Sequence, residues 1–131
     1  MDKESLFYKK QGDKVQCELC PHNCLIIDGA HGKCNVRVNK GGVLYTVNYG
    51  EITSIAQDHI EKKPLYHYKP GSRILSVGSF GCNFSCEFCQ NHSISQERGK
   101  SEYMSPEKLV EVCKSLEDNK IGRASCRERV Y

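Results

Sequence analysis

The sequence has no long hydrophobic run, and this absence excludes a membrane-spanning helix. A helix that crosses a bilayer needs about 20 apolar residues in succession, and nothing in the 131-residue chain approaches that length. The first ten residues, MDKESLFYKK, are charged and lack the apolar core of a secretory signal. We therefore expect a cytoplasmic protein with no membrane partner.

The chain also lacks an excess of charge of one sign once residues 121–131 are left out. Residues 121–131, IGRASCRERVY, look like a translated sequencing adapter, and such a non-native tail is excluded from fold reasoning, although a genuine basic terminus is the alternative. Without the tail's three Arg and one Glu, the formal charge falls from +3 to +1. A nucleic-acid partner is not expected, because that inference needs basic residues clustered on one face.

Cysteine, in contrast, is abundant, with nine residues in the sequence. In a reducing compartment, cysteines are more often metal ligands or catalytic groups than disulfide partners. Cys126 is set aside with the tail, and Cys113 lies on the apolar face of an expected helix, where we expect it to be buried. The other seven cysteines form two groups.

One group is the run GCNFSCEFCQN, in which Cys82, Cys86 and Cys89 have the spacing C-x3-C-x2-C. Closed clusters and structural zinc sites take four protein ligands, so three thiolates in one compact loop better suit a [4Fe–4S] cluster with one iron left open for a substrate. The spacing alone also permits a zinc site completed by His92.

The wider segment 62–95, KKPLYHYKPGSRILSVGSFGCNFSCEFCQNHSIS, resembles the radical SAM superfamily, and in particular the radical SAM enzyme of the AmmeMemoRadiSam system, which is related to pyruvate formate-lyase activating enzymes. The resemblance implies that Cys82, Cys86 and Cys89 hold a [4Fe–4S] cluster whose open iron chelates S-adenosylmethionine, and that the Phe88 backbone lies near the adenine. It also implies reductive cleavage of S-adenosylmethionine to a 5′-deoxyadenosyl radical, which takes hydrogen from a protein or small-molecule substrate.

The same resemblance implies partners and a fold. The partners are a reduced flavodoxin or ferredoxin-type electron donor and proteins of the associated families. The fold is α/β, the start of a partial (β/α)6 barrel (first strand, cluster loop, first helix), preceded by a small β-rich four-cysteine module. The expected divisions are a Cys-rich β module (1–60), a connector (61–72), the first βα unit (73–120) and the non-native tail (121–131). The chain would then be a fragment that cannot complete the reaction alone.

The second group of cysteines lies near the start of the chain, in CELCPHNCLIIDGAHGKC. Cys17, Cys20, Cys24 and Cys34 have the spacing C-x2-C-x3-C-x9-C, which makes a closed tetrahedral zinc site plausible. An auxiliary iron–sulfur cluster on the same four thiolates fits the spacing too. A third interpretation makes Cys17, Cys20 and Cys24 the open site, although Cys34 then remains as a ready fourth ligand. His22 and His31 are expected near this site but not as ligands.

Two classes of function follow from these patterns. The first is the radical SAM oxidoreductase. The alternative is a non-enzymatic module whose two zinc sites support contacts with other molecules, and it predicts zinc at both sites and no iron. A ferredoxin-type electron carrier fits less well, because its cluster is closed by four cysteines.

The remaining sequence predicts local structure. Segments 36–38 and 43–47 flank Asn39-Lys40-Gly41-Gly42 and indicate a hairpin. Segment 73–78 is apolar and suits a buried parallel strand, with the cluster loop at its carboxyl end. Ser105 and Pro106 suit the start of a helix. The connector carries Lys62, Lys63, Tyr66 and His67, which are candidates to line an active site, although a solvated linker explains them equally well.

Overall fold

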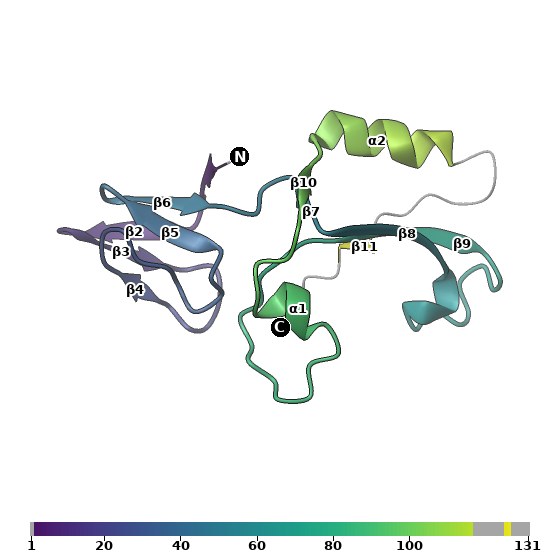
Figure 1. Ribbon diagram of the computed structural model, residues 1–131, viewed down its shortest axis with the longest axis horizontal. Coiled ribbons are helices and arrows are strands. Elements are labelled where there is room, and N and C mark those ends of the chain that lie inside the picture. The colour runs from purple at the N-terminus through teal and green to yellow at the C-terminus, as the bar shows by residue number, and fades with distance from the viewer. Residues whose placement is uncertain (1, 117–124, 127–131) are drawn as a thin grey trace.

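The computed structural model describes residues 2–116 and 125–126, and its first half consists of six short strands (Figure 1). These strands form two antiparallel three-stranded sheets, in the orders β1-β6-β5 and β2-β3-β4. Their bounds are β1 Lys3–Glu4, β2 Tyr8–Gln11, β3 Lys14–Cys17, β4 Leu25–Ile26, β5 Arg37–Lys40 and β6 Val43–Thr46.

The hairpin of β5 and β6 confirms the prediction made from its turn. Gly41 and Gly42 have φ angles of 60° and 76°, a conformation that glycine adopts without steric cost. Asn39 is fully buried and fixes the turn, because its side-chain oxygen accepts a hydrogen bond from the Gly42 N–H (3.0 Å) while its amide donates to the Ile26 carbonyl (2.9 Å). The buried amide therefore connects the two sheets.

Two small hydrophobic clusters hold this half together. One consists of Val15, Cys17, Ile26 and Leu44. The other joins Val36, Val38 and Val47 to Phe80, a residue from much later in the chain that is 4% exposed. The second cluster thus fastens the start of the cluster loop, residues 79–91, to the N-terminal sheets.

The second half of the described chain has a longer hairpin and three short helices. Strand β8 (Ser54–His59) pairs antiparallel with β9 (Arg73–Gly78) along six residue pairs, from Ser54 opposite Gly78 to His59 opposite Arg73. A two-residue ladder joins β7 (Glu51–Ile52) to β10 (Glu102–Tyr103). The helices are the 3-10 turn η1 (Ile60–Lys62), α1 (His92–Ser95) and α2 (Pro106–Ser115).

The predicted fold class is wrong. A partial (β/α)6 barrel starts with a strand that is followed by a helix and a parallel neighbour, but β9 has as its main partner the antiparallel β8, which precedes it in the chain. The described residues form small, mostly antiparallel sheets with short helices, so this is a β-rich protein. The apolar sequence of β9 specifies burial but not the direction of the neighbouring strand, which explains the error.

In the described part of the chain, β9 also has a parallel partner, β11 (Ser125–Cys126). The rest of the predicted non-native tail lies outside the described residues.

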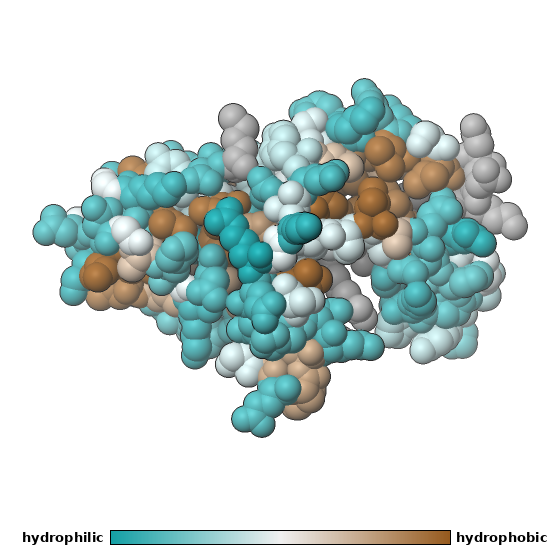
Figure 2. Space-filling model, viewed as in Figure 1, coloured by the Kyte–Doolittle hydropathy of each residue, from teal (hydrophilic) through white to brown (hydrophobic). Residues whose placement is uncertain are grey.

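Helix α2 begins where the sequence predicts, but its apolar face is not buried. Ser105 is the N-cap and its hydroxyl accepts a hydrogen bond from the Lys108 N–H, with Pro106 at the first helical position. Cys113, expected in a core, is only half-buried, and Val110 is 51% exposed. Figure 2 shows apolar surface between α2 and the β8–β9 hairpin. No helix in the described part of the chain combines the length and hydrophobicity needed to cross a membrane.

Candidate metal centre

The cluster loop follows the carboxyl end of β9 and is held by backbone contacts at several points. The Gly81 N–H donates to the Ile94 carbonyl in α1 (2.8 Å), and the Gln96 side chain donates to the Phe84 carbonyl (2.6 Å). The Asn48 amide donates to the Phe80 carbonyl (2.9 Å). Helix α1 and the N-terminal half thus support the loop from two sides.

The three cysteines of the loop differ in exposure and in local partners. Cys82 and Cys89 are half-buried, whereas Cys86 is exposed. The Phe84 N–H lies 3.4 Å from the Cys82 Sγ, and the Cys89 Sγ lies 3.2 Å from the Ser95 hydroxyl of α1. A further hydrogen bond from the Cys89 N–H to the Cys86 carbonyl closes a tight turn. Backbone and hydroxyl donors near the sulfurs are the kind of contact that tunes a bound metal.

The N-terminal cysteines lie in the turns that end β3 and precede β5. Cys17 ends β3 and is buried, while Cys20, Cys24 and Cys34 are half-buried. Burial raises the pKa of the Cys17 thiol above its ordinary value, and the nearby thiols of Cys34 and Cys20 raise it further. A metal ion would oppose this effect, because it binds the thiolate form.

The two cysteine groups meet at Gly81. Its φ is 95°, and a Cβ at this position would lie 2.3 Å from the Val36 Cγ1 and 3.1 Å from the Cys34 carbonyl oxygen. A second contact comes from His22, whose Nε2 donates to the Asn83 carbonyl (2.8 Å) and so requires the tautomer protonated on Nε2. Sequence reasoning placed His22 near the first group but missed this link, because residues far apart in the chain make it.

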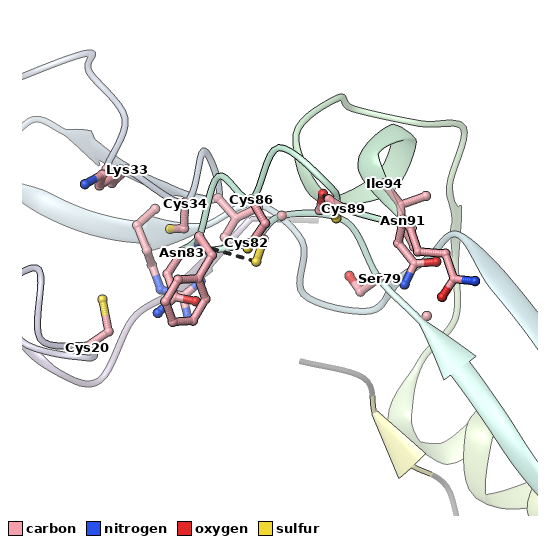
Figure 3. A pocket seen from close by; sticks show the side chains of 18 of the residues that line it. Cys20, Lys33, Cys34, Ser79, Cys82, Asn83, Cys86, Cys89, Asn91 and Ile94 are labelled. Carbon is pink, nitrogen blue, oxygen red and sulfur yellow. Dashed lines mark hydrogen bonds between the residues drawn. The ribbon is translucent and has the colours of Figure 1, made fainter. Parts of the chain in front are cut away.

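All seven cysteines line one cavity of about 730 Å³. Figure 3 shows Cys20 and Cys34 from the N-terminal segment and Cys82, Cys86 and Cys89 from the cluster loop around this hollow. The prediction of two separate cysteine sites did not foresee a shared cavity. The contacts that join the two groups are made by Phe80 and Gly81, which precede the first loop cysteine.

The opposite wall of the cavity is one face of the β8–β9 hairpin. Alternate residues of the two strands share this face, and those that line the cavity have mostly small side chains: Ser54, Ala56, Asp58, Ser76 and Gly78. Of the four connector candidates, Lys63 lines the cavity. The wall therefore leaves room for a ligand next to the cysteines.

Asp58 is the charged group of this wall. Its carboxylate accepts hydrogen bonds from the Lys62 ammonium (2.7 Å) and the Ser76 hydroxyl (3.0 Å), and the Lys63 ammonium lies 3.6 Å away. The hydrogen bond from Lys62, followed by that from Ser76, lowers the pKa of the Asp58 carboxyl. Asp58 is thus an anion held between two lysines.

In neither cysteine group do the thiols lie together as a set of metal ligands. Among the residues that the structure describes, no three His, Cys, Asp or Glu side chains are close enough together to hold a metal ion. The thiols are nevertheless chemically suited to either proposed metal group, since soft thiolates bind both iron–sulfur clusters and zinc. Binding would have to bring the thiols together, as is common where metal binding and folding are coupled.

The structure also places the two remaining candidate residues, Phe88 and His92. Phe88 is 91% exposed and contacts no core. His92, the alternative fourth zinc ligand, has its Nδ1 3.7 Å from the Glu97 carboxylate.

The site is thus a cysteine-lined cavity on a scaffold of small antiparallel sheets, and comparison with known proteins adds one relative. The chain is 46% identical over 114 residues to the uncharacterized protein MJ0808 of Methanocaldococcus jannaschii. The matched region takes 84% of this chain but 34% of that protein, so the chain spans about a third of the length of the curated relative that it matches. No family model matches the sequence. No solved structure matches it either.

Proposed function

We propose that the chain belongs to a radical SAM oxidoreductase of the AmmeMemoRadiSam type, in which Cys82, Cys86 and Cys89 hold a [4Fe–4S] cluster. The observation that carries the proposal is a set of three thiols, with no fourth in their loop, at a cavity large enough for a small ligand. When bound, such a cluster supplies the electron that cleaves S-adenosylmethionine, and a hydrogen atom is then taken from the substrate.

The chain's own residues would bind and orient the cofactors. Phe80 and Gly81 fix the loop against the N-terminal sheets, so the backbone of Cys82 is held in a defined position. The small side chains of the β8–β9 wall leave space for S-adenosylmethionine beside the cysteines. Phe88 is 91% exposed and therefore open to a ligand, and its backbone would lie near the adenine.

The whole protein's substrate and partners belong to the same proposal. The substrate is a residue of a partner protein or a small molecule, and the electron donor is a reduced flavodoxin or ferredoxin-type protein. A cytoplasmic location follows from the need for a reducing compartment. Since the chain spans about a third of its relative, the complete reaction is proposed for the longer protein.

The test is the iron and sulfide content of the chain after anaerobic reconstitution, compared with a variant in which Cys82, Cys86 and Cys89 are all changed to Ala. We expect about four irons with matching sulfide in the unmodified chain and loss of both in the variant. A Cys113→Ala control, on α2 and away from the cavity lining, should keep its iron.

One result would replace this proposal with the non-enzymatic zinc module. If the chain binds zinc at both cysteine groups and no iron under reconstitution, the radical SAM assignment is wrong. If iron binds and is lost on Cys34→Ser but kept on Cys20→Ser, the cluster is closed by Cys34 as a fourth thiol, and an open site for S-adenosylmethionine is excluded. Cys34 is the N-terminal cysteine whose backbone lies against the start of the loop, which makes it the decisive residue.

A further inference from the structure

The N-terminal cysteines have a geometry that distinguishes their site from the loop site. The Cys17 N–H donates to the Cys24 carbonyl at 2.9 Å, so the two residues lie on neighbouring antiparallel segments. Side chains on such paired positions have Cβ atoms about 4.5–5.5 Å apart. Two thiols are thus brought near each other by the backbone alone.

Two tight turns bring the other cysteines back toward this pair. The Asn23 N–H donates to the Cys20 carbonyl (3.1 Å), and Asn23 has a positive φ of 43°. Asn35, directly after Cys34, has a φ of 60°, and its N–H donates to the Gly32 carbonyl (2.9 Å). Asn is the non-glycine residue that most readily adopts this conformation, so the turns are specified locally.

The pairing of Cys17 with Cys24 suits the short ligand spacing of a single zinc ion. With zinc–sulfur bonds of about 2.3 Å in a tetrahedron, the sulfurs of one zinc site are roughly 4 Å apart. Cys17 and Cys24, which lie on paired backbone positions, reach this separation by side-chain rotation. Cys17 is also packed among Val15, Ile26 and Leu44, which leaves little room on that side.

We propose that Cys17, Cys20, Cys24 and Cys34 bind one structural zinc ion that forms the N-terminal wall of the cavity. The ion would fix Cys34 and, through its carbonyl and Val36, the surface on which Gly81 packs. His22, between Cys20 and Cys24, would then be held where it donates to the Asn83 carbonyl. This proposal does not depend on the radical SAM assignment, because it concerns different thiols.

The test loads the whole chain with Zn²⁺ alone and measures bound zinc by elemental analysis after gel filtration. We expect one zinc per chain in the unmodified protein and in the Cys82, Cys86, Cys89 triple Ala variant. We expect loss of zinc in Cys20→Ser, a change in a half-buried turn that avoids the packed Cys17. Cys20→His should restore zinc, because imidazole is also a zinc ligand.

The rescue pair keeps the test decisive even if a variant is unstable. Cys20→His changes the size of the side chain more than Cys20→Ser does, so zinc that is lost in Ser and restored in His reports ligation and not misfolding. Circular dichroism checks that both variants fold. Zinc that persists in Cys20→Ser, zinc that disappears in the triple Ala variant, or iron and sulfide that survive in that variant after anaerobic reconstitution would each overturn the proposal.

Discussion

Gly81 is the residue at which the two cysteine segments meet. Its φ of 95° lies in a region that favours glycine, and a Cβ there would overlap the Val36 side chain at 2.3 Å. Neither neighbour of Gly81 can move freely, since Val36 belongs to a buried cluster and the Cys34 carbonyl is backbone. Because Cys82 directly follows Gly81, any shift of the Gly81 backbone also moves the first loop cysteine.

We predict that Gly81→Ala destabilises the fold by about 1–3 kcal/mol, through backbone strain and overpacking. The measurement is urea unfolding followed by circular dichroism, which suits a chain without tryptophan. Gly12→Ala is the matched control, because Gly12 also has a positive φ of 61° but its Cβ would meet nothing within 4 Å. Equal losses in the two variants would show that the contact with Val36 contributes nothing.

At the scale of elements, Asp58 connects β8, η1 and β9. Hydrogen bonds from Lys62 and Ser76 lower the pKa of its carboxyl below the ordinary value of 3.8. A carboxyl whose pKa is lower in the folded than in the unfolded state stabilises the fold above the unfolded pKa. That contribution is lost as the pH falls through the folded pKa.

We therefore predict that Asp58→Asn reduces the loss of stability on acidification. Between pH 7 and pH 3, the melting temperature of the unmodified chain should fall further than that of Asp58→Asn, with most of the difference appearing below about pH 4. Glu97→Gln, at an exposed carboxylate that faces the imidazole of His92 instead of a lysine, is the control and should follow the unmodified chain more closely. Parallel curves for Asp58→Asn and the unmodified chain would contradict the prediction.

Elements with local signals were predictable, and those defined by distant pairing were not. The glycines at 41 and 42 predicted the β5–β6 hairpin, and Ser105 with Pro106 predicted the start of α2. A short strand was expected over residues 51–56, but nothing in the sequence of β8, SIAQDH, specifies its partner, so its antiparallel pairing with β9 was missed. Without that partner, an apolar β9 was assigned to a parallel sheet.

The same distinction holds for the candidate site at the scale of the whole molecule. Cysteine spacing predicted two groups of ligands, because spacing is a local property of the sequence. Their shared cavity depends on Phe80 entering a cluster of valines and on His22 reaching the Asn83 carbonyl. Nothing in the local sequence of either residue specifies its partner, so the meeting of the two groups required the structure.

Phe80 packs against the valine cluster of the N-terminal half, so its loss should weaken the contact between the two halves. We predict that Phe80→Ala costs roughly 3–5 kcal/mol, since the aromatic ring is buried among Val36, Val38 and Val47. The measurement is urea unfolding at a fixed metal content. Phe84→Ala, at a ring that is 44% exposed in the same loop, is the control and should cost much less. Similar costs for the two variants would contradict a joining role for Phe80.

The position of Phe80 also bears on how the chain folds during synthesis. The N-terminal sheets leave the ribosome first and can form their local hairpins at once, whereas the valine cluster remains without its aromatic ring until β9 has been made. In that interval the thiols of the first cysteine group are already present and the cluster loop is not. The protein would therefore meet metal ions in a fixed order, with the N-terminal group available before the loop group exists.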